Sequence, residues 1–269
     1  MRKTSLQLLF LFAVVSAIIS GCNKDEPLVI LPLEQDVQLG AQVHEEILNM
    51  QDSLPILSEQ QYPQVYQYLR NIMSNIVASE DILYEEEFGY DKIYIIKNDN
   101  ELNAFATPGG YVYVYTGLLK YLDSEDHLAG VLGHEIAHAD RRHTVRAIQR
   151  DLGVQLLLDV ALGQNQGAVV QVVRALGDLQ YSRSNEEEAD TYSVRYLSNP
   201  QSPYECDGAA GFFEKLQNEG SGGGTPEFLS THPNPGNRIE AIQAEAATQG
   251  CDTAPCTTCS YEQFKIMLP

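Results

Sequence analysis

The feature that most constrains this chain is the pentapeptide His134-Glu135-Ile136-Ala137-His138, which places two histidines four residues apart. Asp123 or Ser124 can cap a helix that runs through it. Residues four apart in a helix share one face, so both imidazoles can reach one metal ion, with Glu135 beside them. The buried face of this helix is predicted to contain Leu128, Val131, Leu132 and Ile136. The fold must therefore bury this helix and supply a further ligand from another element.

A third metal ligand is predicted from a second helix. A metzincin would carry glycine and histidine at positions 141 and 144, but Arg141 and Thr144 stand there, which excludes that class. The strongest candidate is the acidic run 182–190, in which Glu186 and Asp190 share a helical face. Acidic runs are usually solvated. Next to a histidine pair of this spacing, the run favours a ligand carboxylate with a supporting acid one turn on.

The remaining pattern predicts an α+β fold. Helical periodicity covers residues 33–50 and 64–77, and alternating residues then predict strands at Ile93–Ile96 and Tyr111–Tyr115. The chain beyond is mostly helical. We therefore expect a predominantly helical domain with a small β-sheet next to the histidine-bearing helix.

These motifs resemble peptidase family M48, the gluzincin metalloproteases. The resemblance rests on residues 134–138 together with Glu186, Ala189 and Asp190, and covers residues 31–247. Other segments that fit the family are residues 33–40, 103–110 and 116–119, His143, and residues 231–239. The apolar stretches 154–162 and 168–179 are too short to cross a bilayer and predict a helical hairpin. This favours the soluble extracytoplasmic, BepA- and Oma-like, branch, and implies a zincin-type fold.

The resemblance implies a role for each matching residue. His134, His138 and Glu186 would bind one Zn²⁺ ion per chain, with a fourth position left for water. Glu135 would be the general base that takes a proton from the zinc-bound water as it attacks the scissile carbonyl, and then passes it to the leaving amine. Asp190 would not bind the metal itself but would orient one of the ligand histidines.

His232 has a less defined place in this scheme. It lies in a Thr-His-Pro-Asn-Pro segment that resembles a family loop whose histidine sits over the metal. There it would either stabilise the oxyanion or plug the fourth position, with support from Arg238; the alternative is a histidine in an ordinary proline-rich turn. Glu188 is offset around the helix and is the poorer ligand, and His143 is expected to pack or cap rather than to bind metal.

We expect Tyr111–Tyr115 to be an edge strand that binds substrate. Its residues Tyr111, Val112 and Tyr113 would pair with an extended peptide by strand addition, which selects unfolded or flexible segments. An ordinary half-buried strand is the other interpretation, and both can hold.

The N-terminus predicts a sorting signal. Arg2 and Lys3 precede an apolar stretch, residues 6–19, that is too short for a stable span. Small residues before Cys22 resemble a bacterial lipobox, so residues 1–21 would be cleaved and Cys22 lipidated; an ordinary secretory signal with an incidental cysteine is the alternative. Residues 22–32 would form the lipidated tether.

The tether also bears on location. Lys24, Asp25 and Glu26 resemble a tag that exports lipoproteins to the cell surface, although a charged run is equally a solvated tether. The absence of aspartate directly after Cys22 favours the outer membrane by resemblance. We therefore expect an extracytoplasmic lipoprotein on the periplasmic or the cell-surface face of that membrane.

Four other cysteines remain after the anchor: Cys206, Cys251, Cys256 and Cys259. In an oxidising compartment an even number predicts two disulfides, with the connectivity open. The Cys-Thr-Thr-Cys run ending at Cys259 could instead be a redox or zinc motif, but no second pair accompanies it.

Charge excludes one class of partner. With 17 Lys+Arg against 37 Asp+Glu, the net charge is −20, so nucleic acid is not an expected partner. We predict a signal peptide at 1–21, a tether at 22–32, a zinc metallopeptidase domain at 33–247 and a cysteine-containing tail at 248–269.

The predicted function is a lipid-anchored zinc metalloendopeptidase that cleaves unfolded or misassembled envelope proteins. Its partners would be polypeptides and the membrane. The alternatives are a chaperone or binding module that keeps a metal site plugged by His232, and an exported nutritional or host-directed protease.

Overall fold

The computed structural model describes residues 28–219, 227–233 and 236–269. The predicted signal peptide, the lipidation of Cys22 and the export tag at residues 24–26 lie outside these ranges. Within them, no helix combines the length and apolar character that a membrane span needs.

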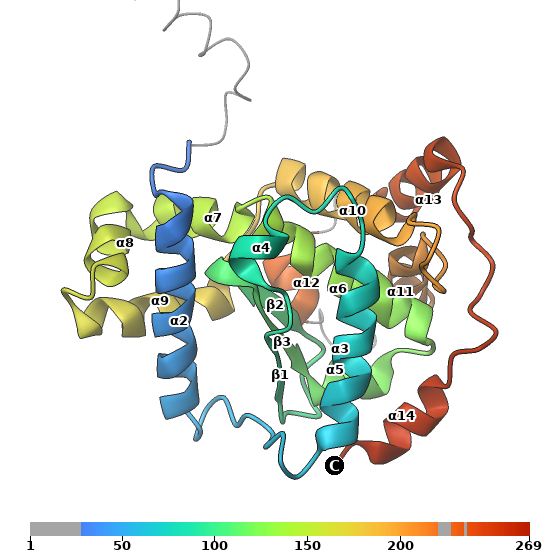
Figure 1. Cartoon of the computed structure of the whole chain (residues 1–269), viewed down its shortest axis with the longest axis horizontal. Helices are drawn as coiled ribbons and strands as arrows, with labels where there is room; N and C mark the ends of the chain where they lie inside the picture. The colour runs from blue at the N-terminus through green and yellow to red at the C-terminus, as the bar shows by residue number, and fades with distance from the viewer. Residues whose placement is uncertain (1–27, 220–226, 234–235) are drawn as a thin grey trace, which may run out of the picture.

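Helices dominate the chain and enclose a small sheet (Figure 1). The predicted helices at residues 33–50 and 64–77 are confirmed as α2 and α3, and the apolar stretches form the short helices α8 and α9. The helices are α2 (Leu33–Asn49), α3 (Pro63–Val77), α4 (Glu85–Phe88), α5 (Thr116–Tyr121), α6 (Glu125–Asp140), α7 (His143–Leu152), α8 (Val154–Ala161), α9 (Gln166–Asp178), α10 (Arg183–Leu197), α11 (Gly208–Glu219), α12 (Glu227–Thr231), α13 (Arg238–Gln249) and α14 (Tyr261–Met267).

The sheet corrects one prediction. Its strands β1 (Ile93–Ile96), β2 (Ala104–Thr107) and β3 (Tyr111–Tyr115) lie in the order β1-β3-β2. Tyr111–Tyr115, predicted as an edge strand for substrate, is therefore the central strand, parallel to β1 and antiparallel to β2. The tight turn Pro108–Gly110, with Gly109 at φ 75° and Gly110 at φ 80°, folds β2 back against it. Because both edges of β3 are paired, Tyr111, Val112 and Tyr113 cannot receive a further strand.

The two faces of the sheet lead into two apolar clusters. Ile95, Val112 and Val114 belong to the larger cluster, which includes α3, α6 and α11. Tyr113 and Tyr115 point the other way, into the cluster formed with α2, α8 and α9. In the view of Figure 1, α2 and the α8–α9 hairpin lie on one side of the sheet, and α10, α11 and α13 on the other. This leaves α6 at the centre of the larger cluster.

Two disulfides form, as predicted; one joins the C-terminal segment to the domain and the other lies within that segment. The pairs are Cys206–Cys251 and Cys256–Cys259. The backbone N–H of Cys256 also donates to Asp126 Oδ2 at 3.1 Å, so the tail is held against the first turn of α6. The redox-active or zinc-binding interpretation of the Cys-Thr-Thr-Cys run is not needed to explain these contacts.

Close packing of α6 requires glycine at one position. A Cβ atom added at Gly130, one turn before His134, would lie 2.1 Å from the backbone nitrogen of Ala209 in α11. The Gly130 carbonyl also accepts a hydrogen bond from Ser193 Oγ of α10 at 2.7 Å. The missing side chain thus lets α6 approach both neighbours.

Gly130→Ala should lower the free energy of unfolding by about 2 kcal/mol or more, because the backbones must separate. Gly177→Ala is the matched control: a Cβ at Gly177 in α9 meets nothing within 4 Å, so the change should stabilise the protein by about 0.5–1 kcal/mol. Urea denaturation measures both values. Equal stability of the two variants would contradict the close-packing argument.

Candidate metal centre

The histidine motif lies in the last turns of α6, a helix whose residues are almost all buried. The Ser124 hydroxyl caps this helix by accepting a hydrogen bond from the His127 backbone N–H at 3.1 Å. Helices α3, α10 and α11 and strand β2 pack around it, so His134 and His138 are only 2% and 0% exposed. Both imidazoles therefore face protein groups rather than bulk water.

Glu186 reaches these histidines from α10. The Ser182 hydroxyl caps α10 by accepting from the Asn185 N–H at 3.1 Å, which places the fully buried Glu186 in the first turn. Its Oε1 lies 3.4 Å from His138 Nε2, and its Oε2 lies 3.5 Å from His134 Nε2. The structure thus brings together the three residues that the sequence indicated as metal ligands.

The chemistry of this cluster fits a divalent metal ion. The Nε2 atoms of His134 and His138 face each other at 3.0 Å. Ligand atoms of these histidines, Glu186 and His232 all lie within 4.8 Å of one another. Imidazole nitrogens and a carboxylate that converge in this way form a donor set typical of zinc and related ions.

His232 enters the cluster from the segment after α12. Its Nδ1 lies 3.1 Å from Glu186 Oε1 and 3.3 Å from His134 Nε2. The ring stacks on Phe228, with centroids 4.3 Å apart, and is 1% exposed. Its Nε2 is buried without a hydrogen-bond partner among the described residues. His232 is thus part of the site and is not an ordinary turn histidine.

Glu135 lies beside the cluster with an unusual carboxylate. Both of its oxygens are buried and lack hydrogen-bond partners within the described part of the chain. His232 Nε2 lies 3.5 Å from its Oε1. Burial raises the pKa of Glu135 to about 7, and the charge of His232 only partly opposes this shift. Such a group can both accept and release a proton near neutral pH.

Asp190 contacts His134 at Nδ1, and Arg238 in turn binds Asp190. Asp190 Oδ1 lies 2.9 Å from His134 Nδ1, and Arg238 donates from Nε and Nη2 to the Asp190 carboxylate at 2.7 and 2.5 Å. Arg238 Nη1 lies 2.9 Å from Glu186 Oε2. Burial alone would raise the pKa of Asp190, but the neighbouring Arg238 and His134 hold this pKa below its ordinary value. Both carboxylates are therefore balanced by one buried guanidinium.

Sequence reasoning missed Tyr181. Its ring stacks on His138 with centroids 3.8 Å apart, and its hydroxyl lies 3.0 Å from Thr144 Oγ1. Thr144 Oγ1 also donates to the Ala106 carbonyl at 3.1 Å, which links α7 to β2. A large apolar residue directly before the capping Ser182 is the signal that could have placed Tyr181 against the helix.

Other predicted residues lie outside the cluster. Glu188 points away from it and contacts His143, with 3.1 Å between Oε2 and Nε2. Tyr113 lies on the α2 side of the sheet, where its hydroxyl is 2.9 Å from His44 Nδ1. Of the four cysteines, only the Cys206–Cys251 pair links the C-terminal segment to the domain.

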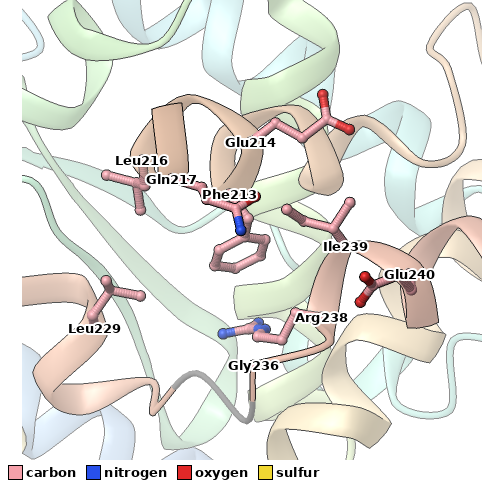
Figure 2. Close-up of a pocket in the computed structure, with 9 residues that line it drawn as sticks. All are labelled: Phe213, Glu214, Leu216, Gln217, Leu229, Gly236, Arg238, Ile239 and Glu240. Carbon is pink, nitrogen blue, oxygen red and sulfur yellow. The ribbon is translucent and has the colours of Figure 1, made fainter. Parts of the chain in front are cut away.

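A cavity of about 290 Å³ adjoins the cluster through Arg238. Figure 2 shows its walls, which come from α11, α12 and the start of α13. The Arg238 guanidinium lies over the Phe213 ring, 4.1 Å from its centroid. Leu216, Leu229 and Ile239 add apolar side chains to the lining, and Glu214, Gln217 and Glu240 add polar and charged ones. The cavity therefore offers polar and apolar contacts side by side, close to the metal centre.

A buried helix that carries His134, Glu135 and His138, a second helix that supplies Glu186 and a small mixed sheet define a zincin-type metalloprotease domain. The chain belongs to peptidase family M48, whose model matches residues 63–246. The resemblance found in the sequence motifs is thereby confirmed.

Several curated proteins are similar to this chain. The Beta-barrel assembly-enhancing protease of Escherichia coli (strain K12) is 27% identical over 250 residues, which cover 88% of this chain and 48% of that protein. The Mitochondrial metalloendopeptidase OMA1 of Arabidopsis thaliana is 33% identical over 153 residues, 56% of this chain and 31% of the relative. The Metalloprotease YcaL of Escherichia coli (strain K12) is 29% identical over 163 residues, 58% of this chain and 62% of the relative. The chain spans about half the length of the assembly-enhancing protease.

Arg238→Met should lower the free energy of unfolding of the metal-free protein by about 3–5 kcal/mol, because Asp190 and Glu186 would remain buried without their cation. Arg195→Met in α10 is the control: Arg195 pairs with Glu245 near the surface, and its side chain is 34% exposed, so the loss should stay below about 1 kcal/mol. Urea unfolding in the presence of a chelator measures both. Similar losses in the two variants would show that Arg238 does not balance the buried carboxylates.

Proposed function

We propose that this protein is a zinc-dependent metalloendopeptidase and that His134, His138 and Glu186 bind one Zn²⁺ ion per chain. The observation that carries the proposal is the convergence of two facing imidazole nitrogens, 3.0 Å apart, on the buried carboxylate of Glu186, next to the buried carboxylate of Glu135. Family membership supports the reaction class.

The residues of the site divide the chemistry between them. A bound zinc ion supplies a Lewis acid that polarises the scissile carbonyl and lowers the pKa of water. Glu135 accepts a proton from the attacking water and delivers it to the leaving amine, because burial raises the pKa of its carboxyl group to about 7. Asp190 accepts the Nδ1 proton of His134, which leaves Nε2 of that ring free to bind metal.

The proposed substrates are unfolded or misassembled envelope proteins. The relatives named as beta-barrel assembly-enhancing proteases support this class of substrate. The cavity beside Arg238 has a mixed lining, in which Phe213, Leu229 and Ile239 can contact apolar side chains of such substrates. Such side chains are exposed in proteins that have not completed folding.

Two substitutions separate the base from a ligand. Glu135→Gln should retain about one zinc ion per chain and lower casein cleavage by a factor of about 10² to 10⁴, because an amide cannot accept the proton. His138→Ala should lose both zinc and cleavage, because one ligand is removed. Metal analysis of the purified proteins and a casein assay measure the two effects.

The matched control is Glu187→Gln, an exposed residue on α10 that should leave zinc content and cleavage unchanged. Unchanged zinc in His138→Ala would contradict the ligand assignment. Full cleavage by Glu135→Gln would mean that another group acts as the base.

A second candidate function is a binding module or chaperone with a plugged metal site. It is favoured by the position of His232, whose Nδ1 lies within 3.3 Å of both a ligand nitrogen and a ligand oxygen. In this arrangement His232 would occupy the fourth ligand position.

The plug makes His232→Ala informative. If His232 occupies the fourth position, its removal should raise basal casein cleavage several-fold, about 3- to 10-fold, because water and substrate gain access. Initial rates at equal zinc content provide the measurement. A fall in rate would instead assign His232 to stabilisation of the oxyanion.

We further propose that residues 1–21 are a signal peptide, residues 22–32 a lipidated tether, residues 33–247 the peptidase domain and residues 248–269 a tail. Lipid on Cys22 would anchor the protein to the bacterial outer membrane, on its periplasmic or surface face. The small residues before Cys22 support this arrangement.

Cys22→Ser should abolish labelling by a fatty-acid analogue and move the protein from the membrane fraction to the soluble fraction, because the sulfur that carries lipid is absent. Fractionation of expressing cells measures the shift. Membrane association equal to that of the unaltered protein would contradict the anchor, and protease treatment of whole cells distinguishes the two faces.

A further inference from the structure

Nδ1 of His138, the ring nitrogen that does not face the metal cluster, contacts a residue that has no role in the proposed reaction. While Nε2 faces the metal cluster, Nδ1 lies 3.1 Å from Nδ1 of His143, the first residue of α7. The other nitrogen of His143, Nε2, lies 3.1 Å from Glu188 Oε2. A continuous row of polar atoms thus runs from the metal centre through His143 to a carboxylate that is 44% exposed.

Metal binding would fix the protons along this row. The inference rests on the proposed function, because it takes His138 Nε2 as a metal ligand. That nitrogen must then offer its lone pair, so the neutral ring carries its proton on Nδ1 and donates it to His143 Nδ1. His143 must accept there, so its own proton lies on Nε2 and is donated to Glu188. Each ring is left with one tautomer.

The two ligand histidines are held in different ways. His134 is oriented directly by Asp190, which is 3% exposed and paired with Arg238. For His138, the carboxylate lies one imidazole further away and reaches the surface. A change at the surface of α10 can therefore act on one ligand of the pair while it leaves the other intact.

The backbone conformation of Arg142, the residue before His143, determines where the His143 ring lies. Arg142 adopts φ 59°, a left-handed conformation that is rare for residues other than glycine. Its guanidinium donates to both carboxylate oxygens of the buried Asp36 at 2.7 and 2.9 Å, and to the Leu31 carbonyl at 2.6 Å. These contacts to the start of α2 keep the reversal between α6 and α7 that turns His143 back onto His138.

We propose that His143 and Glu188 are positioning residues that fix the tautomer and orientation of His138 for metal binding. Neither residue binds the metal. Loss of the Glu188 acceptor removes the hydrogen bond at His143 Nε2, so the orientation and tautomer of that ring are less tightly fixed and it holds His138 less well.

The test uses the full-length purified protein and zinc alone as the probe. Glu188→Ala should weaken zinc binding about tenfold in competition with a chelator, because the acceptor is lost. Glu188→Gln keeps an acceptor oxygen and should recover most of the affinity. Glu187→Ala, the same change one residue earlier on the exposed side of α10, should bind zinc as the unaltered protein does.

A spectroscopic readout distinguishes positioning from a general effect on stability. In the zinc-loaded protein, the His138 Nδ1 proton should give a slowly exchanging imidazole signal in proton–nitrogen NMR. The signal should persist in Glu188→Gln and be lost or broadened in Glu188→Ala. Glu188 is half-exposed, so these variants are expected to fold, and circular dichroism of the metal-free forms checks this.

Equal zinc affinity and equal Nδ1 signals in Glu188→Ala and Glu187→Ala would overturn the positioning role while the metal site stands. Failure of the unaltered protein to bind zinc would overturn the proposed function itself. The two failures are therefore distinguishable.

Discussion

The contact between α6 and α10 is the constraint on which the site depends. Two glycines make it close: Gly130 lies against α11 and receives Ser193, and a Cβ at Gly133 would lie 3.0 Å from Ser193 Oγ. At this separation Glu186 comes within 3.5 Å of both histidine Nε2 atoms. A wider spacing would leave the carboxylate too far away to share a cation with them. The metal centre is thus a consequence of helix packing rather than of a binding loop.

Burial sets the electrostatics of this centre. Glu135, Glu186 and Asp190 are all nearly inaccessible to water, and Arg238 is the buried cation that contacts two of them. Three carboxylates against one guanidinium leave an excess of buried negative charge. A divalent ion would neutralise this excess, which offsets the cost of burying the carboxylates away from water. Burial is also the main cause of the raised pKa of Glu135, and the nearby charge of Glu186 adds to this shift.

Much of the site could be predicted because its signals are local. The spacing of His134 and His138, the Ser124 and Ser182 caps and the helical offset between Glu186 and Glu188 are all properties of single helices. The strand error arose from a non-local property: periodicity marks Tyr111–Tyr115 as extended, but only pairing with β1 and β2 makes it central. The residue before the Ser182 cap indicates locally that Tyr181 packs against α10, but its stacking on His138 depends on how α7, α10 and β2 meet.

The Cys206–Cys251 bond has a consequence for the durability of the enzyme. It closes a covalent loop of sequence separation 45 that contains α11, α12, His232 and Arg238. A protease is exposed to cleavage by its own copies, and a single cut anywhere in that loop would still leave both fragments joined through sulfur. The half of the site that comes from this loop would then stay attached to the half on α6 and α10. In an oxidising compartment, a nicked molecule would remain one molecule.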